Sequence, residues 1–138
     1  MAGSTEAKDN SIRLFNMMVV PVLVYGCIAA YIGATYGLQA GWTWFSWHPF
    51  CMTIGYVVLV GNAILLKKIG GYTNTKYHAA LMMACMVVTC FGWYVIYTAK
   101  EMKGKPHLTS YHGQLGAAVM VSNIALALFG MVGLNPDW

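Results

Sequence analysis

Four histidines are the residues of this chain whose type and position best suit chemistry: His48, His78, His107 and His112. Three of them lie close to the start of an apolar segment. A buried imidazole is costly in lipid, so a polar group at such a depth is a functional-site hypothesis by default. Imidazole is also a common metal ligand.

The composition indicates an integral membrane protein. The 138 residues are 59% hydrophobic and 9% charged, with a mean hydropathy of +0.58, whereas a soluble domain has about 25% charged residues. The net charge of +4 comes from lysines in short loops and forms no basic stripe, so we expect a lipid bilayer around the chain and no nucleic-acid partner. All four cysteines fall in apolar segments and are expected to be packed thiols.

The elements that must position the histidines are four apolar stretches, each near the roughly 20 residues that cross a bilayer as a helix. They lie at about 14–36, 47–66, 77–98 and 111–134. We predict an all-α fold, an up-down bundle of four transmembrane helices over 14–134, preceded by a polar N-terminal segment, 1–13. The excess of lysine and arginine on the N-terminal side predicts cytosolic termini.

Local signals mark the helix starts. Ser46 is the predicted cap of the second helix, Thr75 of the third, and Thr109 or Ser110 of the fourth.

Chain direction predicts how deep the histidines lie. His48 and His112 begin the second and fourth helices, which run the same way, so both should lie near the non-cytosolic face. His78 begins the third helix and should lie about 27 Å away, toward the cytosol. One level thus has a matched pair of imidazoles.

Two imidazoles at one depth on facing helices are what a six-coordinate haem needs. Each histidine shares a helical stripe with other residues. The stripes are His48, Met52, Gly55 and Asn62 on the second helix, and His112, Gly116, Met120 and Asn123 on the fourth. Glycines at 55, 113 and 116 leave room for a flat macrocycle or for close helix contact. Since the chain has no C-x-x-C-H motif, the group would be haem b, held non-covalently.

Other interpretations of the histidines stay open. His48 or His112 could bond to lipid headgroups or to a neighbouring backbone, and His107, outside the last span, could have a loop role. Zinc between the helices is an alternative cofactor, but no third or fourth Cys, Asp or Glu stands at the same level.

Three segments around these histidines resemble the cytochrome b-561 family of transmembrane ascorbate-dependent reductases. They are Phe45-Ser46-Trp47-His48-Pro49 with the apolar run that follows, Lys76-Tyr77-His78, and Lys105-Pro106-His107 through Tyr111-His112-Gly113. The chain is especially similar to the metazoan branch called domain-containing protein two.

The resemblance implies a six-helix fold, of which this chain holds the first four, with two haems b. It implies that His48 and His112 ligate the non-cytosolic haem and that His78 ligates the cytosolic one. The family takes the second ligand of that haem from a fifth helix, before which this chain ends. We expect a truncated chain, a lost second haem, or a ligand from another chain; a homo-oligomer also stays open.

The resemblance also implies two substrate sites. Cytosolic ascorbate would bind near Lys68 and Lys76, with Lys67 close by, although a basic cluster here also serves as a positive-inside stop signal. On the other face, His107 and Tyr111 would line the site where monodehydroascorbate or ferric iron accepts the electron.

The leading hypothesis is therefore a haem b protein that transfers single electrons across an endomembrane (ER or vesicle) or the plasma membrane, as a transmembrane ascorbate-dependent (ferri)reductase. No nucleophile or catalytic triad is visible. The alternatives are a non-conducting truncated isoform and a haem-binding membrane-anchor subunit of a larger complex.

Overall fold

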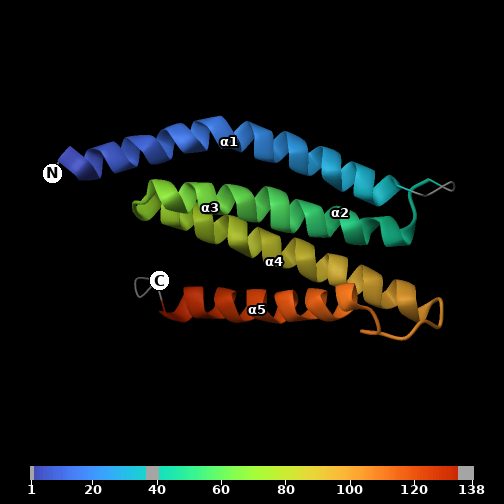
Figure 1. Cartoon of the computed structure of the whole chain (residues 1–138). Coiled ribbons are helices and arrows are strands. Elements are labelled where there is room, and N and C mark those ends of the chain that lie inside the picture. The colour runs from blue at the N-terminus through green and yellow to red at the C-terminus, as the bar shows by residue number, and fades with distance from the viewer. Residues whose placement is uncertain (1, 37–40, 134–138) are drawn as a thin grey trace.

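The structure, a computed structural model, describes residues 2–36 and 41–133. Its helices run back and forth (Figure 1). Four helical stretches are long and apolar enough to cross a membrane: Thr5–Thr35, Trp44–Ile69, Tyr72–Glu101 and Tyr111–Gly130. Successive stretches run in opposite directions in Figure 1. The predicted all-α fold with four membrane-spanning helices is thus confirmed, and the chain is a multi-pass membrane protein.

The helices are longer than the apolar stretches from which they were predicted. Helix α1 spans Ala2–Thr35 and includes nearly all of the polar segment 1–13, while α4 spans Tyr72–Glu101. Hydropathy marks only the part of a helix that suits lipid. The helix itself continues into water where residues such as Glu6, Ala7 and Lys8 favour it.

The second membrane span combines three kinds of helix. A 3₁₀ turn, η1 (Trp44–Ser46), leads into α2 (Trp47–Thr53), a π-helical stretch η2 (Ile54–Leu59) and α3 (Val60–Ile69). A π-helical turn within an α-helix is rare and is frequently found at functional sites. It lies here directly after α2, the helix that carries His48.

Two of the predicted caps are wrong and one is confirmed. Ser46 makes no cap bond to α2; its hydroxyl accepts a hydrogen bond from the backbone N–H of Thr43, which caps η1. Thr75 lies inside α4, because that helix begins at Tyr72, and it donates to the Gly71 carbonyl. The hydroxyl of Ser110, however, accepts the N–H of Gly113 at 3.2 Å at the start of α5 (Tyr111–Gly133).

The first three spans are in close contact through glycines. A Cβ on Gly26 of α1 would collide with Val58, and one on Gly55 of η2 would collide with Thr89 of α4. A Cβ on Gly92 of α4 would stand 2.9 Å from the Cβ of Cys51. Small residues allow such close approach between membrane helices.

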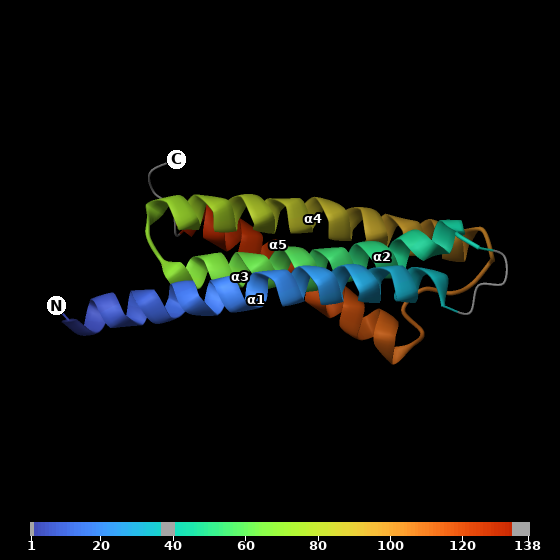
Figure 2. The same cartoon turned by 90° about the horizontal axis from the view of Figure 1, so that it is seen from above.

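The last helix is packed differently. Among the described elements, α5 has close backbone contact with α4 alone, whereas α4 also lies against α2, η2 and α3. Figure 2 shows the first part of α5 diverging from the other helices, at the end where α2 begins. The second and last spans therefore have no close backbone contact with each other among the described residues.

Candidate functional site

His48 is held in one orientation by the third span. It lies in the first turn of α2, is half-buried, and its Nδ1 is 2.9 Å from the backbone carbonyl oxygen of Gly92 on α4. A carbonyl only accepts, so Nδ1 carries the proton and donates. In the neutral ring, Nε2 then has no proton and keeps a lone pair that can bind a metal. Histidines that ligate metals usually donate their other nitrogen in this way.

His112, on the last span, lies close to His48. It is the second residue of α5, and the ring centres of the two histidines are 6.3 Å apart, with the ring planes at 89°. An imidazole nitrogen lies about 2 Å from a metal ion that it binds, so two rings on opposite sides of one iron have centres about 6 Å apart. The observed separation fits two axial ligands of one iron.

The two rings line a cavity of about 580 Å³ in the gap between α2 and α5. Most of its wall is apolar, and a cofactor site of this kind is a concave apolar space with a few convergent polar groups. The residues that line it include Phe45, His48, Met52, Tyr56, Trp93, Ile96, Tyr97, Lys100, His107, His112, Gly116 and Met120. The cavity thus provides space beside the paired imidazoles.

The glycines near the histidines serve two different purposes. Gly55 faces Thr89 and allows close packing of the second and third spans. Gly116 lines the cavity, and no atom lies within 4 Å of where its Cβ would be. Gly113 also lines the cavity. The sequence left open whether these glycines provide room for a cofactor or close helix contact, and the structure shows that each use applies to a different glycine.

Several residues of the cavity wall were missed at the sequence level. Tyr56 of η2 donates to the sulfur of Met120 on α5 at 3.8 Å and so joins the second and last spans. It follows His48 and Met52 at helical spacing, which could have indicated it. On α4, Trp93, Ile96, Tyr97 and Lys100 have the spacing of a single helix face.

The asparagines of the predicted stripes do not line the cavity. Asn62 and Asn123 are both buried, with 8% and 9% of their surfaces exposed. The Oδ1 of Asn62 and the Nδ2 of Asn123 have no hydrogen-bond partner within the described ranges. Each stripe therefore reaches the cavity only through the residues nearest its histidine.

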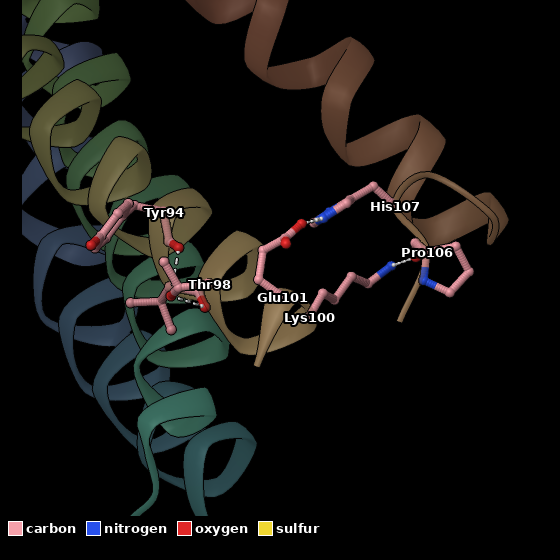
Figure 3. Close-up of polar contacts among 7 residues, drawn as sticks. Tyr94, Thr98, Lys100, Glu101, Pro106 and His107 are labelled. Carbon is pink, nitrogen blue, oxygen red and sulfur yellow. Dashed lines mark hydrogen bonds and ion pairs between the residues drawn. The ribbon is translucent and has the colours of Figure 1, made fainter. Parts of the chain in front are cut away.

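His107 lies at the edge of the cavity, in the connection between α4 and α5. Its ring stacks on Tyr97 with centres 4.5 Å apart, and its Nε2 is 2.7 Å from a carboxylate oxygen of Glu101 (Figure 3). Tyr111, the other predicted acceptor-site residue, is 86% exposed and does not line the cavity. The structure thus brings His107, but not Tyr111, to the paired histidines.

His78 lies at the opposite end of the bundle, in the same kind of setting as His48. Its Nδ1 is 2.9 Å from the backbone carbonyl oxygen of Ala63 on α3. Gly92, which holds His48, follows His78 on α4 by about 14 residues, or about 21 Å of helix. The chain's other three histidines lie around the cavity, so none of them is beside His78.

The lysines predicted to bind ascorbate gather at this end as well. Lys67, Lys68 and Lys76 are all exposed. The ammonium of Lys67 donates to the Thr75 hydroxyl at 3.1 Å, and that of Lys76 lies over the Tyr72 ring, 4.6 Å from its centre. These lysines and His78 therefore flank one connection, the turn between α3 and α4.

No group of three or more histidine, cysteine or acidic side chains that could hold a metal ion occurs in the described part of the chain. The structure thus provides one pair of imidazoles, His48 with His112, and the single imidazoles of His78 and His107. Such ligands suit a metal whose other ligands come from a macrocycle.

Comparison with known proteins identifies the family. The family model of eukaryotic cytochrome b561 matches residues 47–136, which is well over half of the chain and includes His48, His78 and His112. The chain belongs to the eukaryotic cytochrome b561 family. The resemblance to this family, which was seen in the three segments around His48, His78 and His112, is thereby confirmed.

Curated relatives of this cytochrome b561 chain carry reductase names. The human transmembrane ascorbate-dependent reductase CYB561 is 31% identical over 104 residues, which cover 68% of this chain and 41% of the relative. The pig protein of the same name is 30% identical over 128 residues, 86% of this chain and 48% of the relative. The mouse transmembrane reductase CYB561D2 is 30% identical over 86 residues, 56% and 39%.

The chain spans less than half the length of these three relatives. No solved structure matches it significantly.

Proposed function

We propose that this cytochrome b561 chain binds haem b between His48 and His112 and takes part in electron transfer across a membrane. The observation that carries the proposal is the 6.3 Å separation of the two imidazole centres beside an apolar cavity of about 580 Å³. Bound there, haem b supplies a one-electron redox couple inside a low-dielectric surrounding.

The chain's own residues have separate roles in this proposal. Gly92 fixes the tautomer of His48, so that Nε2 is available as a ligand. Ser110 caps α5 and so fixes the helix end that carries His112. The aromatic and methionine side chains of the cavity would surround the bound group with mostly apolar atoms. Water exclusion and nearby hydrogen bonds are the main means by which a protein tunes a haem potential.

The family supports a direction and substrates for this proposal. Relatives named ascorbate-dependent reductases support ascorbate as the donor, and we assign it to the end with Lys67, Lys68 and Lys76, which attract an anion. His107 and the cavity edge would then face the acceptor, monodehydroascorbate or ferric iron. The larger number of basic residues at the donor end supports a cytosolic location for that end and for the N-terminus.

A second candidate function is favoured by the setting of His78. Because the other three histidines lie around the cavity, the described residues place no second imidazole beside His78. A protein with a single haem would serve as a haem-binding anchor or a non-conducting form. Haem content per chain separates the two candidates.

The proposal is tested by the haem content and absorption spectrum of the purified protein. We expect haem b, with loss of the pigment in His48→Ala and in His112→Ala. His107→Ala is the matched control, because it removes an imidazole from the same cavity that is not assigned as a ligand. Unchanged pigment in His112→Ala would overturn the assignment.

The number of haems is tested in the same preparations. One haem per chain, unaffected by His78→Ala, favours the single-haem candidate. Two haems, one of which is lost in His78→Ala, favour conduction between the two faces. The conducting form should also reduce an acceptor outside vesicles that are loaded with ascorbate.

A further inference from the structure

The last helix, α5, is anchored to the bundle by a small part of its surface. Among the residues of α5 whose side chains the structure describes, only Met120 and Asn123 are buried, with 8% and 9% of their surfaces exposed. They are three positions apart, so they lie on the same face of the helix. The position of α5, and of His112 at its start, therefore depends on what these two side chains contact.

Tyr56 of the second span is the residue that they meet. Its hydroxyl donates to the sulfur of Met120 at 3.8 Å, and the side chain of Asn123 lies near the same hydroxyl. Among the described residues, η2 and α5 have no close backbone contact, and the bond from Tyr56 is the one hydrogen bond between the second and last spans. Side chains therefore join these two spans.

This contact lies at the inner end of the histidine cavity. Tyr56 follows His48 by eight residues, and Met120 follows His112 by eight residues. At the rise of an α-helix, both lie about 12 Å from the level of the imidazoles. Both line the cavity, and no described residue beyond Tyr56 on the second span or beyond Met120 on α5 does so. Their contact thus sets how far apart the two walls stand.

Tyr56 is firmly supported on its own side. The preceding residue, Gly55, packs directly against Thr89 of α4. Thr89 is fully buried, and its hydroxyl donates to the backbone carbonyl of Cys85 at 2.9 Å. The backbone that carries Tyr56 cannot leave α4 without opening this contact. Because α5 has close backbone contact with α4 alone among the described elements, the bond to Met120 ties the less supported helix to the better supported one.

We propose that Tyr56 is a positioning residue for His112: through Met120, it holds α5 at the distance from the second span at which the two imidazoles face one iron. The part of this inference that concerns the iron rests on the proposed function. Without the hydroxyl, α5 keeps its contact with α4 but can shift relative to α2. The ring of His112 then changes its angle to the ring of His48, which is 89° in the structure.

The variants remove one partner of the bond at a time. Tyr56→Phe deletes the hydroxyl and keeps the ring in the cavity wall. Met120→Leu deletes the sulfur and conserves most of the volume. The matched controls are Tyr25→Phe on α1 and Met83→Leu on α4, which make the same chemical changes at side chains that are 69% and 43% exposed and lie outside the cavity.

The bond itself is tested by thermal unfolding of the purified full-length chain, which requires no haem. Tyr56→Phe and Met120→Leu should each lower the midpoint. The double variant should lie no lower than the lower of the two single variants, because each single change already breaks the same bond. Midpoint changes that simply add in the double variant would show that the two residues act independently and would overturn the tie.

The positioning role is read from the EPR spectrum of the oxidised haem, whose largest g value depends on the angle between the two axial ring planes. This g value should change in Tyr56→Phe and in Met120→Leu and stay constant in both controls. Haem transfer to apomyoglobin should become about threefold faster, the average worth of a hydrogen bond between membrane helices. An unchanged g value in Tyr56→Phe would overturn the positioning role, even if the unfolding midpoint falls.

Failure of the proposed function has a different signature. A protein that binds no haem at these histidines would contradict that function and, with it, the role of Tyr56 toward the iron. The unfolding measurements still decide the rest. Non-additive midpoints keep Tyr56 as the residue that anchors α5, and additive midpoints overturn the anchor as well.

Discussion

The close contact between Gly92 and α2 predicts opposite effects for the same substitution at two glycines. In Gly92→Ala the new Cβ would stand 2.9 Å from the Cβ of Cys51 and from the end of Met52. Overpacking of a tight contact costs about 1–3 kcal/mol, and alanine returns about 1 kcal/mol of helix propensity. We therefore expect a net loss of up to about 2 kcal/mol in the free energy of unfolding.

Gly116→Ala is the matched substitution, since Gly116 is also a glycine within a membrane-spanning helix but lines the histidine cavity and not a helix contact. No atom lies within 4 Å of its new Cβ, so only the helix-propensity gain of about 0.5–1 kcal/mol remains. The two variants should thus differ in sign.

The assay is thermal unfolding of the purified protein in one detergent, followed by tryptophan fluorescence. Gly92→Ala should lower the midpoint and Gly116→Ala should hold or raise it. Gly92→Ala should also alter the haem spectrum, because the Gly92 carbonyl orients His48 at 2.9 Å. Equal midpoints for the two variants would refute the packing of α4 against α2 on which the argument depends.

Three further predictions concern the cavity and the two ends of the bundle. Gly116→Phe should place a ring in the open space of the cavity and lower the haem content while helicity by circular dichroism stays constant; full haem content would contradict the site. Glu101→Gln weakens the exposed contact between Glu101 and the Nε2 of His107, and an exposed pair of this kind is worth at most about 1 kcal/mol, so the fold should be unchanged. His107 should react faster with diethyl pyrocarbonate, and an unchanged rate would show that the contact does not hold the ring. Lys68→Gln, with Lys8→Gln as its control, should raise the KM for ascorbate and leave the KM for ferric citrate unchanged; an equal rise for both substrates would contradict separate sites at the two ends.

The lengths of the apolar segments were enough to predict the membrane-spanning helices and the proximity of His48 to His112. Both histidines begin helices that run in the same direction, so their depth follows from counting residues. The ligand role of each remains a prediction, as do the roles of His78 and of the lysines. Chain direction also predicted that His78 is separate from the pair.

Features that depend on neighbouring helices could not be predicted from local sequence. Gly55 and Gly116 both follow a histidine within the same span, yet one packs against Thr89 and the other faces open space. Only the arrangement of α4 and α5 decides between these uses. The π-helical stretch Ile54–Leu59 likewise depends on how the second span packs.

Neighbouring positions in a helix point in different directions, which explains why Tyr111 does not line the cavity; its predicted role at the acceptor site stays a prediction. Tyr111 directly precedes His112, and successive residues of an α-helix are rotated by about 100°. With the His112 ring directed at His48, Tyr111 is turned outward. His107 reaches the cavity instead because the connection after α4 folds back onto Tyr97.

The central claim, that His48 and His112 are the two axial ligands of one haem iron, is tested most directly by near-infrared magnetic circular dichroism of the oxidised protein. The charge-transfer band in this region depends on the pair of axial ligands. We predict a bis-imidazole band that disappears in His48→Ala and in His112→Ala and is retained in His107→Ala. A bis-imidazole band of full intensity in His112→Ala would contradict the claim.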